Sequence, residues 1–431
     1  MSKESNMLYR RKLDNSANVF PMLSKKKYGK AFRLSVVLNE NINLEKLQIA
    51  VNQTLEMFQV FRVKMKRGFF WYYLEYNEKE PIVKEDDSYQ CKYINSKSNN
   101  DYLFKVTYFK NNINIDIFHA LTDGNNGMVF FREIIYKYIE LMYPDNLNDE
   151  DRKFRKINYD IEDSYGKNYD KTLKPKGFYK EAYILKGDTA KLGQEKITNE
   201  IINLNEFKQE CKKYKATVTQ YMTALLIYAI YKENYIKNKS KSKKPIIVTI
   251  LVNLKKYFES KTLANFFTFI TIEATRKNVD LNSFENIIEF VKQDFQQKLT
   301  KEEIKKVMSM NGKFGNIFLV KILPLWLKII IVRLGYLEIK KYVTITYSNI
   351  GRIEIMEKYK NYIKYFFMII APKPLIKIRC STCTFENKMV FTFSSLLKDN
   401  SIENFVYKFL QEKKIDVEIE CDGGTAEKML I

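Results

Sequence analysis

The sequence predicts an α/β protein made of two halves, each a mixed sheet with helices. Strand-like and helix-like spacings of apolar residues alternate along the chain, and this pattern stops in a polar stretch at 145–178 before it resumes. A chain of 431 residues that is 45% hydrophobic is also longer than one ordinary core requires. We therefore expect an N-terminal domain at 1–150, a linker at 151–178 and a C-terminal domain at 179–431.

Four strands and two helices are expected in the first half. Residues 30–38 alternate as a strand does, and Asn43 then caps a helix with the apolar face Leu44, Leu47, Val51, Leu55 and Phe58. Residues 69–76 form an aromatic strand, and the strands 102–109 and 113–118 are joined by a hairpin turn. Apolar residues at helical spacing predict a second helix at 125–143, the last element of this half.

The second half repeats this mixture of strands and helices. Thr217 and Gln220 form a capping box that opens a helix, and the fully apolar run 245–254 is typical of a buried strand. The remaining predicted elements are four strands and one closing helix, at 265–274, 342–351, 376–385, 388–395 and 402–412.

The charge balance does not by itself identify a partner. Lys and Arg exceed Asp and Glu by 73 to 51, a net charge of +22, but the lysines are scattered and no nucleic-acid motif is present. We therefore expect no nucleic-acid partner. The lysine-rich run 237–244 is interpreted either as a solvated loop or as a segment that attracts the phosphate groups of a ligand.

The cysteines argue against disulfides and against a metal site. Five cysteines at irregular spacings predict no disulfide framework and a reducing, cytoplasmic location. Cys380 and Cys383 lie within one alternating strand, which sends their side chains to opposite faces. We therefore expect no metal to be bound there.

Residues 317–336 are the nearest approach to a membrane element. The N-terminus has no apolar run of signal-peptide length, and Lys321, Lys328 and Arg333 interrupt the apolar segment, which Pro324 kinks or starts. No transmembrane segment is expected. Two interpretations stay open: a buried helix with snorkelling lysines, or a surface that makes weak contact with lipid or an apolar substrate.

FHALTDG, residues 118–124, contains the single histidine of the sequence. His119 follows a predicted strand and therefore projects from a rigid support, and its imidazole, with an unperturbed pKa of about 6.5, can accept a proton near neutral pH. Asp123 stands where the next helix begins, and Gly124 lets the backbone bend. The residues alone fit a general base in a cleft, or a packed histidine followed by an ordinary capping aspartate.

This motif and its surroundings resemble the chloramphenicol-acetyltransferase-like superfamily of coenzyme A dependent acyltransferases, most of all its bacterial alcohol-acetyltransferase-like family. The similar segments follow the family's order over nearly the full chain, at 9–21, 32–38, 67–75, 118–131, 252–267, 348–351 and 413–420. Phe118 replaces the first of two histidines that many relatives carry, and the D-F-G-W-G signature of the plant branch is absent.

The resemblance implies the two-domain chloramphenicol acetyltransferase-like fold, with an active-site tunnel at the interface of the halves. His119 would be the general base that deprotonates the acceptor as it attacks the thioester directly, without an acyl-enzyme. Asp123 would point away from the base and pair with an arginine. The candidates for that arginine are Arg10, Arg11 and Arg33.

Direct transfer also needs hydrogen-bond donors for the oxyanion of the tetrahedral intermediate. Ser348 and Asn349, at the end of a predicted strand, are the first candidates, and Asn253 and Asn265 are weaker ones. Each of these residues is equally compatible with a polar strand end that only satisfies the backbone.

The resemblance thus implies a CoA-dependent acyltransferase of alcohol O-acetyltransferase type, which we expect to be a monomer. Acyl-CoA would be a co-substrate, no cofactor would be bound permanently, and the acceptor of an acetyl or other short or medium acyl group would be a small alcohol or an amine. Two alternatives remain: a condensation-type enzyme that takes its acyl group from an acyl carrier protein, and a non-catalytic member that binds a lipid or a partner protein.

Overall fold

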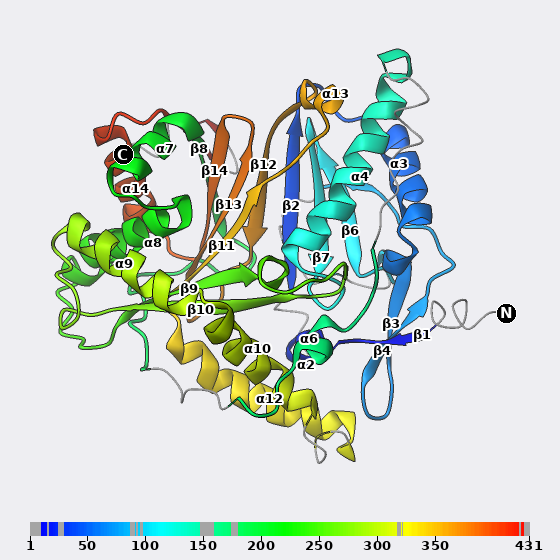
Figure 1. The fold of residues 1–431 in the computed structure, drawn as a ribbon. Coiled ribbons are helices and arrows are strands. Elements are labelled where there is room, and N and C mark those ends of the chain that lie inside the picture. The colour runs from blue at the N-terminus through cyan, green and yellow to red at the C-terminus, as the bar shows by residue number, and fades with distance from the viewer. Residues whose placement is uncertain are drawn as a thin grey trace.

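A computed structural model gives the fold of the chain (Figure 1). It describes residues 10–14, 17–24, 30–86, 91, 94, 98–146, 159–173, 180–316, 320, 322–421 and 424–425. The described residues form sheets of eight, five and three strands with helices packed around them. Because parallel and antiparallel pairs occur together, the two larger sheets are mixed, as predicted.

The five-stranded sheet carries the first half. Its strand order is β12-β2-β7-β6-β5, with β12 at Ile363–Ile370, β2 at Ala31–Leu38, β7 at Asn112–Phe118, β6 at Phe104–Phe109 and β5 at Lys84–Glu85. Helices α3 (Leu44–Met57) and α4 (Gly124–Met142) pack together beside it (Figure 1). The predicted cap of α3 is confirmed, since the Asn43 side chain accepts a hydrogen bond from the Lys46 N–H at 3.0 Å.

The three-stranded sheet has the order β1-β4-β3, with β1 at Arg10–Lys12, β4 at Tyr72–Tyr76 and β3 at Val63–Arg67. The strand predicted at 69–76 begins only at Tyr72. Residues 68–71 form the preceding turn instead, in which the Gly68 N–H donates to the Trp71 carbonyl at 3.0 Å. The aromatic side chains of Phe69 and Phe70 therefore lie at an exposed hairpin tip.

The eight-stranded sheet carries the second half. Its order is β10-β9-β11-β13-β14-β8-β15-β16, at Phe267–Ala274, Ile246–Asn253, Ile345–Arg352, Ile378–Phe385, Lys388–Ser395, Lys196–Asn203, Val417–Cys421 and Gly424–Thr425. One face packs against the helices α7 (Leu204–Lys213), α8 (Val218–Ala229), α9 (Phe284–Lys298) and α14 (Ser401–Glu412). The predicted capping box of Thr217 and Gln220 is present at the start of α8.

The remaining elements in the described part of the chain are five helices and several single turns. The remaining helices are α2 (Val19–Leu23), α6 (Ser164–Asn168), α10 (Lys301–Asn316), α12 (Leu325–Ile339) and α13 (Glu357–Lys360). Single turns lie at Gln59–Phe61, Pro144–Asn146, Leu254–Lys256 and Lys340–Tyr342, and a π-helical turn at Ile230–Ile236 extends α8.

Strand β12 links the two halves. It pairs antiparallel with β2 of the first sheet, and its other edge packs beside β13, where the Ser381 hydroxyl donates to the Met368 carbonyl. Residues 363–370 therefore belong to the sheet of the first half although they lie well beyond residue 179. The linear boundaries at 150 and 178 remain a prediction.

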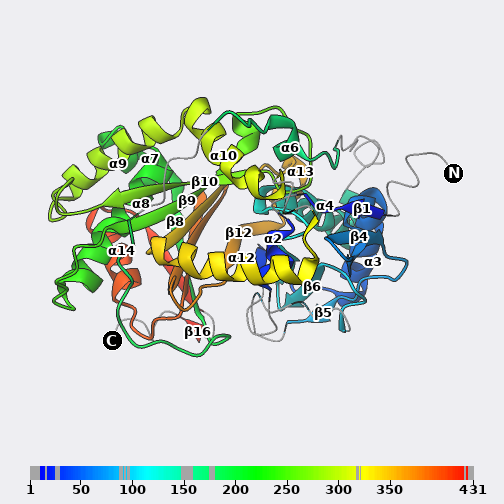
Figure 2. The ribbon, with the colours of Figure 1, turned by 90° about the horizontal axis from the view of Figure 1, so that it is seen from below.

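Helix α12 lies across the lower face of the molecule and contacts α2 (Figure 2). It begins directly after Pro324, but it is not the buried helix with snorkelling lysines that was one interpretation of its sequence. Several of its apolar side chains are exposed, whereas Lys328 points inward, donates to the Phe70 carbonyl at 2.9 Å and lies 3.5 Å from the Trp71 ring centroid. Lys321 lies outside the described residues. No described helix is long and apolar enough to cross a membrane.

The cysteines follow the prediction made from strand alternation. Cys380 and Cys383 are both buried in β13, but one joins the core of the second half and the other the core of the first. The five cysteines, all within the described part of the chain, form no disulfide. Among the described residues, no cluster of His, Cys, Asp or Glu side chains has the composition of a metal site.

Candidate active site

A cavity of about 770 Å³ lies where the two halves meet. The first half contributes α2, the start of β2 and the loop between β7 and α4, while the second half contributes β9, β10, β11 and α12. Of the seven residues predicted at the site, six line this cavity: His119, Asp123, Gly124, Asn253, Ser348 and Asn349. Asn265 is almost completely buried and contacts His119 instead.

Alternate residues of three neighbouring strands form one wall of the cavity, because successive side chains in a strand point to opposite faces. These residues are Thr249, Leu251 and Asn253 of β9, Phe267, Phe269 and Thr271 of β10, and Thr346 and Ser348 of β11. The opposite face of the same strands packs into the core of the second half. The wall is therefore held rigidly by a sheet.

His119 lies at the exit of β7, as predicted, and is held by an aromatic surround. Its backbone N–H donates to the Lys30 carbonyl at 2.9 Å. The imidazole stacks on Phe20 of α2, with centroids 4.4 Å apart, and its other ring neighbours are Phe32 and Phe267. The ring is thus fixed by contacts from both halves.

Asn265 determines which ring nitrogen of His119 carries the proton. Its side-chain nitrogen donates to the His119 backbone carbonyl at 2.9 Å, because a carbonyl can only accept. The Asn265 side-chain oxygen is therefore the atom that faces the His119 Nδ1, at 3.0 Å. This oxygen accepts a hydrogen bond from the Nδ1–H group, so Nδ1 carries the proton and the lone pair of the neutral ring lies on Nε2.

The surroundings of His119 favour the neutral imidazole. Burial is the largest influence and lowers its pKa from 6.5 to about 4. The hydrogen bonds to its own backbone and to Asn265 act in the opposite direction, whereas the positive charges of Lys373 and Arg379 lower the pKa further. An uncharged ring with a lone pair on Nε2 is able to accept a proton from a bound molecule.

The loop that carries His119 is joined to residues 263–266 of the second half by further hydrogen bonds. The Thr122 hydroxyl donates to the Leu263 carbonyl at 2.7 Å, and the Asn126 amide donates to the Ala264 carbonyl at 2.7 Å. The Asp123 carboxylate accepts from the Phe266 N–H at 2.8 Å. Thr122 and Asn126 were not predicted as site residues. Their partners in these bonds are backbone carbonyl groups, which every residue carries, so the sequence gives no sign of this pairing.

Asp123 has no arginine partner among the described residues. Its carboxylate caps α4 by accepting from the Asn126 N–H at 3.0 Å, and the cation whose charge acts on it is Lys255. Burial raises the Asp123 pKa above its usual value, and the hydrogen bonds oppose that change. Asp123 is therefore placed by backbone donors of both halves.

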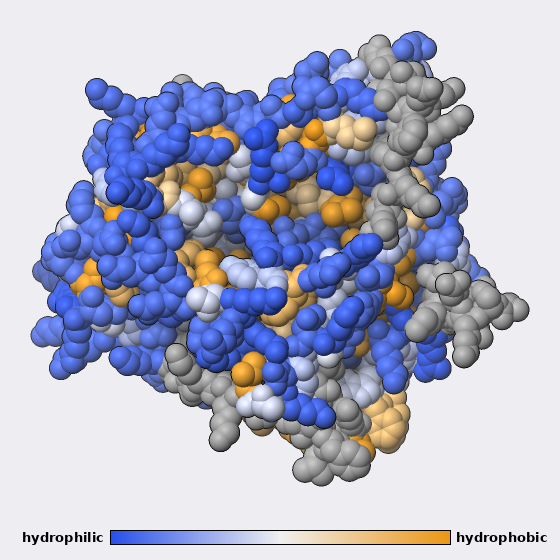
Figure 3. Space-filling view, viewed as in Figure 1, coloured by the Kyte–Doolittle hydropathy of each residue, from blue (hydrophilic) through white to orange (hydrophobic). Residues whose placement is uncertain are grey.

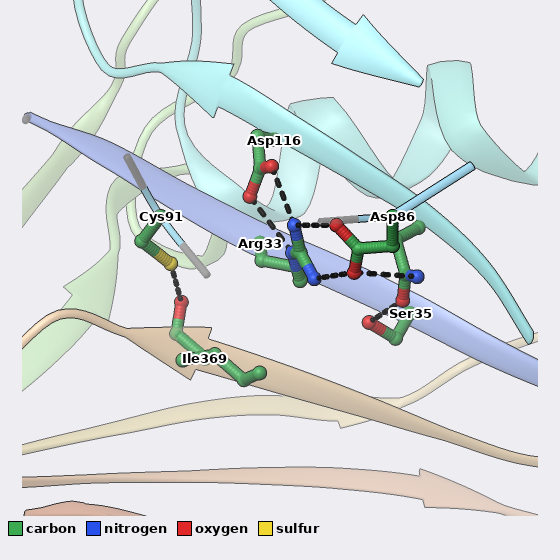
Figure 4. Close-up of polar contacts among 7 residues, drawn as sticks. Arg33, Ser35, Asp86, Cys91, Asp116 and Ile369 are labelled. Atoms are coloured by element: carbon green, nitrogen blue, oxygen red, sulfur yellow. Dashed lines mark hydrogen bonds and ion pairs between the residues drawn. The ribbon is translucent and has the colours of Figure 1, made fainter. Parts of the chain in front are cut away.

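The three candidate arginines are engaged elsewhere. Arg33 is buried between the carboxylates of Asp86 and Asp116, and its Nη2 lies 2.7 Å from Asp116 (Figure 4). Arg11 donates to the Val60 carbonyl, and Arg10 lies over the Tyr73 ring. The expectation that one of them pairs with Asp123 is wrong, because each has other partners and the Asp123 carboxylate accepts from backbone N–H groups instead.

The other predicted residues differ in how much of their hydrogen-bonding capacity is used. Asn349 donates to the Thr219 hydroxyl at 2.9 Å and accepts from the Gly351 N–H at 2.8 Å, while the Asn253 oxygen accepts from the Lys255 N–H at 3.0 Å. Ser348 lies on the cavity side of β11. A side chain in place of Gly124 would come within 3.0 Å of Ile350, so glycine keeps this part of the wall clear.

No protein-family model matches the sequence, and no curated protein matches it. Solved structures do match its fold. TRI101 of Fusarium graminearum, complexed with coenzyme A and deoxynivalenol, has a TM-score of 0.61 at 10% identity, over 95% of this chain and 99% of its own. The trichothecene 15-O-acetyltransferase TRI3 of Fusarium sporotrichioides has a TM-score of 0.59 at 8% identity, over 94% of this chain and 95% of its own.

A condensation domain is similar to the same extent. The starter condensation domain of rhizomide synthetase, in complex with C8-CoA, has a TM-score of 0.57 at 9% identity and 95% coverage of both chains. The chain therefore has the fold that chloramphenicol-acetyltransferase-like enzymes and condensation domains share, and the predicted fold class is confirmed.

Proposed function

We propose that this chain is a CoA-dependent acyltransferase that moves an acetyl or other short or medium acyl group from acyl-CoA to the hydroxyl of a small alcohol. The fold is that of enzymes crystallised with coenzyme A or acyl-CoA. The observation that carries the proposal is the orientation of His119, whose Nδ1 donates to Asn265 so that the Nε2 lone pair is left for a substrate.

In the proposed reaction His119 is the general base. Its Nε2 takes the proton of the acceptor hydroxyl while the oxygen attacks the thioester carbonyl carbon. The tetrahedral intermediate then collapses, the carbon–sulfur bond breaks, and the proton passes from the imidazolium to the leaving thiolate. The products are an ester and free coenzyme A, and no covalent bond to the protein is formed.

The second half supplies the groups proposed for the oxyanion. Ser348 is the first candidate, because its side chain lines the cavity on β11. Asn349 retains one amide hydrogen beyond the bond to Thr219, whereas Asn253 is oriented by the Lys255 backbone. For Asn265 we propose a positioning role, since both its polar groups contact His119.

The lysine-rich run 237–244 does not contribute to the cavity wall. None of its residues, all of which the structure describes, lines the cavity. Lys244 instead pairs with Glu181. This placement supports the interpretation of the run as a solvated loop.

We also propose that the outer face of α12 rests on an anionic membrane surface. Its exposed apolar residues, together with the hairpin tip, are Trp326, Ile330, Leu334, Leu337, Phe69 and Phe70. Lys66, Arg67 and Arg333 are exposed beside them. Apolar side chains that enter the acyl boundary next to basic residues that attract headgroups are typical of interfacial helices. By contrast, the face seen in Figure 3 is mainly hydrophilic.

A two-substrate assay tests the proposed function. Purified protein is incubated with acyl-CoA donors of increasing chain length and with a panel of alcohols and amines, and thiol release is followed. We expect release that depends on both substrates. Release only from an acyl group on carrier protein would favour the condensation-type alternative, and no release from either donor would favour the non-catalytic one.

A further inference from the structure

Three cations from separate segments meet in the wall of the cavity. Lys30 precedes β2, Lys373 lies between β12 and β13, and Arg379 is the second residue of β13. We call these three residues the cation cluster. Tyr336 of α12 lies among them: its hydroxyl accepts from the Lys373 Nζ at 2.7 Å, and its ring centroid is 4.5 Å from the Lys30 Nζ.

Among the described residues of the cavity wall, no carboxylate balances Lys373 and Arg379. Asp123 is the one acidic residue among the described residues that line the cavity, and its oxygens are engaged by backbone N–H groups. The charges that act on Lys373 are those of Lys30 and Arg379, and burial together with these like charges lowers the Lys373 pKa well below its usual value. Burying like charges together is unfavourable unless an anion joins them.

Arg379 also carries an unused donor. Its Nε is buried and has no hydrogen-bond partner within the described residues. The contrast with Arg33 is informative, because that buried guanidinium is satisfied by the two carboxylates of Asp86 and Asp116 (Figure 4). A guanidinium in a cavity wall that keeps an unsatisfied donor is suited to bind a carboxylate or phosphate.

The cluster lies close to His119. The Lys30 carbonyl accepts the His119 N–H at 2.9 Å, and the charges of Lys373 and Arg379 act on the imidazole. In coenzyme A a long pantetheine arm separates the thioester from the phosphates. An anion held beside His119 therefore fits the acceptor better than it fits the phosphates of a donor whose thioester must reach the same histidine.

We propose that the cation cluster binds a carboxylate or phosphate on the acceptor, so that the preferred acceptor is a hydroxy acid or a phosphorylated alcohol rather than a neutral alcohol. This inference rests on the proposed acyl transfer. The bound anion also offsets the positive charges next to His119, which makes the ring a stronger base when the acceptor is in place.

Matched acceptor pairs test the proposal. Thiol release is measured with hydroxy acids and with their methyl esters, in the wild type and in Lys373→Gln and Arg379→Gln. We expect the wild type to prefer the acids and each variant to raise their KM about tenfold or more, since each removes a charged hydrogen bond. The KM for the esters and for acyl-CoA stays unchanged. Lys377→Gln, on the same turn but outside the cavity, is the control.

Donor analogues separate the possible sources of the anion. If the variants raise the KM for acyl-CoA but not for acyl-pantetheine, the cluster binds the phosphates of the donor and the proposal is overturned. It is equally overturned if the wild type uses acids and esters alike. A donor with a succinyl group in place of a neutral acyl group tests whether the cluster binds an anion on the acyl chain. A preference for succinyl-CoA that depends on Lys373 and Arg379 would also contradict the proposal.

A binding measurement keeps this inference separate from the proposed function. Calorimetry measures the binding of a hydroxy acid to the His119→Ala variant, in which turnover does not interfere. We expect the affinity to be about tenfold or more lower in the double variant that also carries Arg379→Gln. Arg379→Lys retains the charge and should recover part of the affinity. Binding that depends on Arg379, together with no thiol release by the wild type, would support the cluster and reject the acyltransferase. Equal binding with and without Arg379→Gln would reject the cluster.

Discussion

At the scale of single residues, the structure turns the single histidine into an oriented, neutral imidazole. Orientation comes from Asn265 and from the stacking of Phe20, and neutrality comes mainly from burial. Both properties are what a general base requires, since the lone pair must face the substrate and must be unprotonated at working pH.

Replacing His119 by alanine should reduce turnover by about 10²–10⁴-fold, the range for loss of a positioned general base. Thermal unfolding of the variant should remain cooperative, because the ring lines the cavity and belongs to neither hydrophobic core. Thiol release within a factor of three of the wild type would remove His119 from the reaction.

The low pKa of His119 also predicts a pH dependence of stability. The unfolded state binds a proton here below pH 6.5, whereas the folded state does so only near pH 4. The free energy of unfolding therefore falls as the pH drops from 6.5 towards 4. The free energy of unfolding is measured with urea at pH 7 and at pH 5. Its decrease between the two pH values should be larger in the wild type than in His119→Gln by on the order of 1–2 kcal/mol. Equal losses would mean that His119 is freely protonated.

Asn265→Ala should lower kcat by about 10²-fold, because the ring is no longer held in the required tautomer and orientation. The KM for acyl-CoA should change little. Asn265→Asp keeps an acceptor towards Nδ1 and should retain more activity, with the acidic limb of the pH–rate profile shifted upward by the added negative charge. An alanine variant as active as the aspartate variant would contradict the positioning role.

Asp123→Asn should destabilise the fold as well as lower activity. The carboxylate accepts from the backbone of Asn126 and of Phe266, and an amide has only one oxygen to serve both. A loss of about 1–2 kcal/mol in the free energy of unfolding is expected. The control is Asp163→Asn, which changes an exposed cap of α6 and should cost less. An Asp123→Asn variant of wild-type stability would contradict the account.

At the scale of elements, α12 has two faces with different surroundings. Ile331, Val332, Gly335 and Tyr336 line the cavity, while the opposite side is exposed and apolar. A sequence pattern alone does not separate these environments, because a helix that is apolar on all sides reads as buried. The inward position of Lys328 was equally unpredictable, since it depends on Trp71 of a distant hairpin.

The proposed membrane contact of α12 predicts binding to vesicles. Wild-type protein should co-sediment with phosphatidylserine-containing vesicles, less at high salt, and Trp326→Glu with Leu334→Glu should reduce the bound fraction about tenfold or more. Ile236→Glu changes an exposed isoleucine on another surface and serves as the control. Equal co-sedimentation of all three proteins would contradict the contact.

The sequence predicted most of the helices and strands whose signal lies within a short stretch of residues. The capped helix α3, the β6–β7 hairpin and the capping box of α8 all follow from residues within a few positions of each other. Strand β12 was missed, because its assignment to the first sheet depends on pairing with β2 over more than three hundred residues. The cation cluster was missed for the same reason, since its members come from three separate segments.

At the scale of the whole molecule, the cavity exists only because both halves contribute to it. The His119 loop is tied to residues 263–266 of the second half, and β12 joins the two sheets. A site completed by two halves suits a reaction in which donor and acceptor are bound together. The central claim is therefore direct transfer from thioester to acceptor with His119 as the base.

Initial-rate kinetics test this claim most directly. Acyl-CoA and the acceptor are varied against each other while thiol release is measured. The account predicts intersecting double-reciprocal lines, because both substrates must be bound before the acyl group moves, and it predicts no acyl-protein after rapid quenching. Parallel lines together with an isolable acyl-protein would show a covalent intermediate and would contradict His119 as a general base in direct transfer.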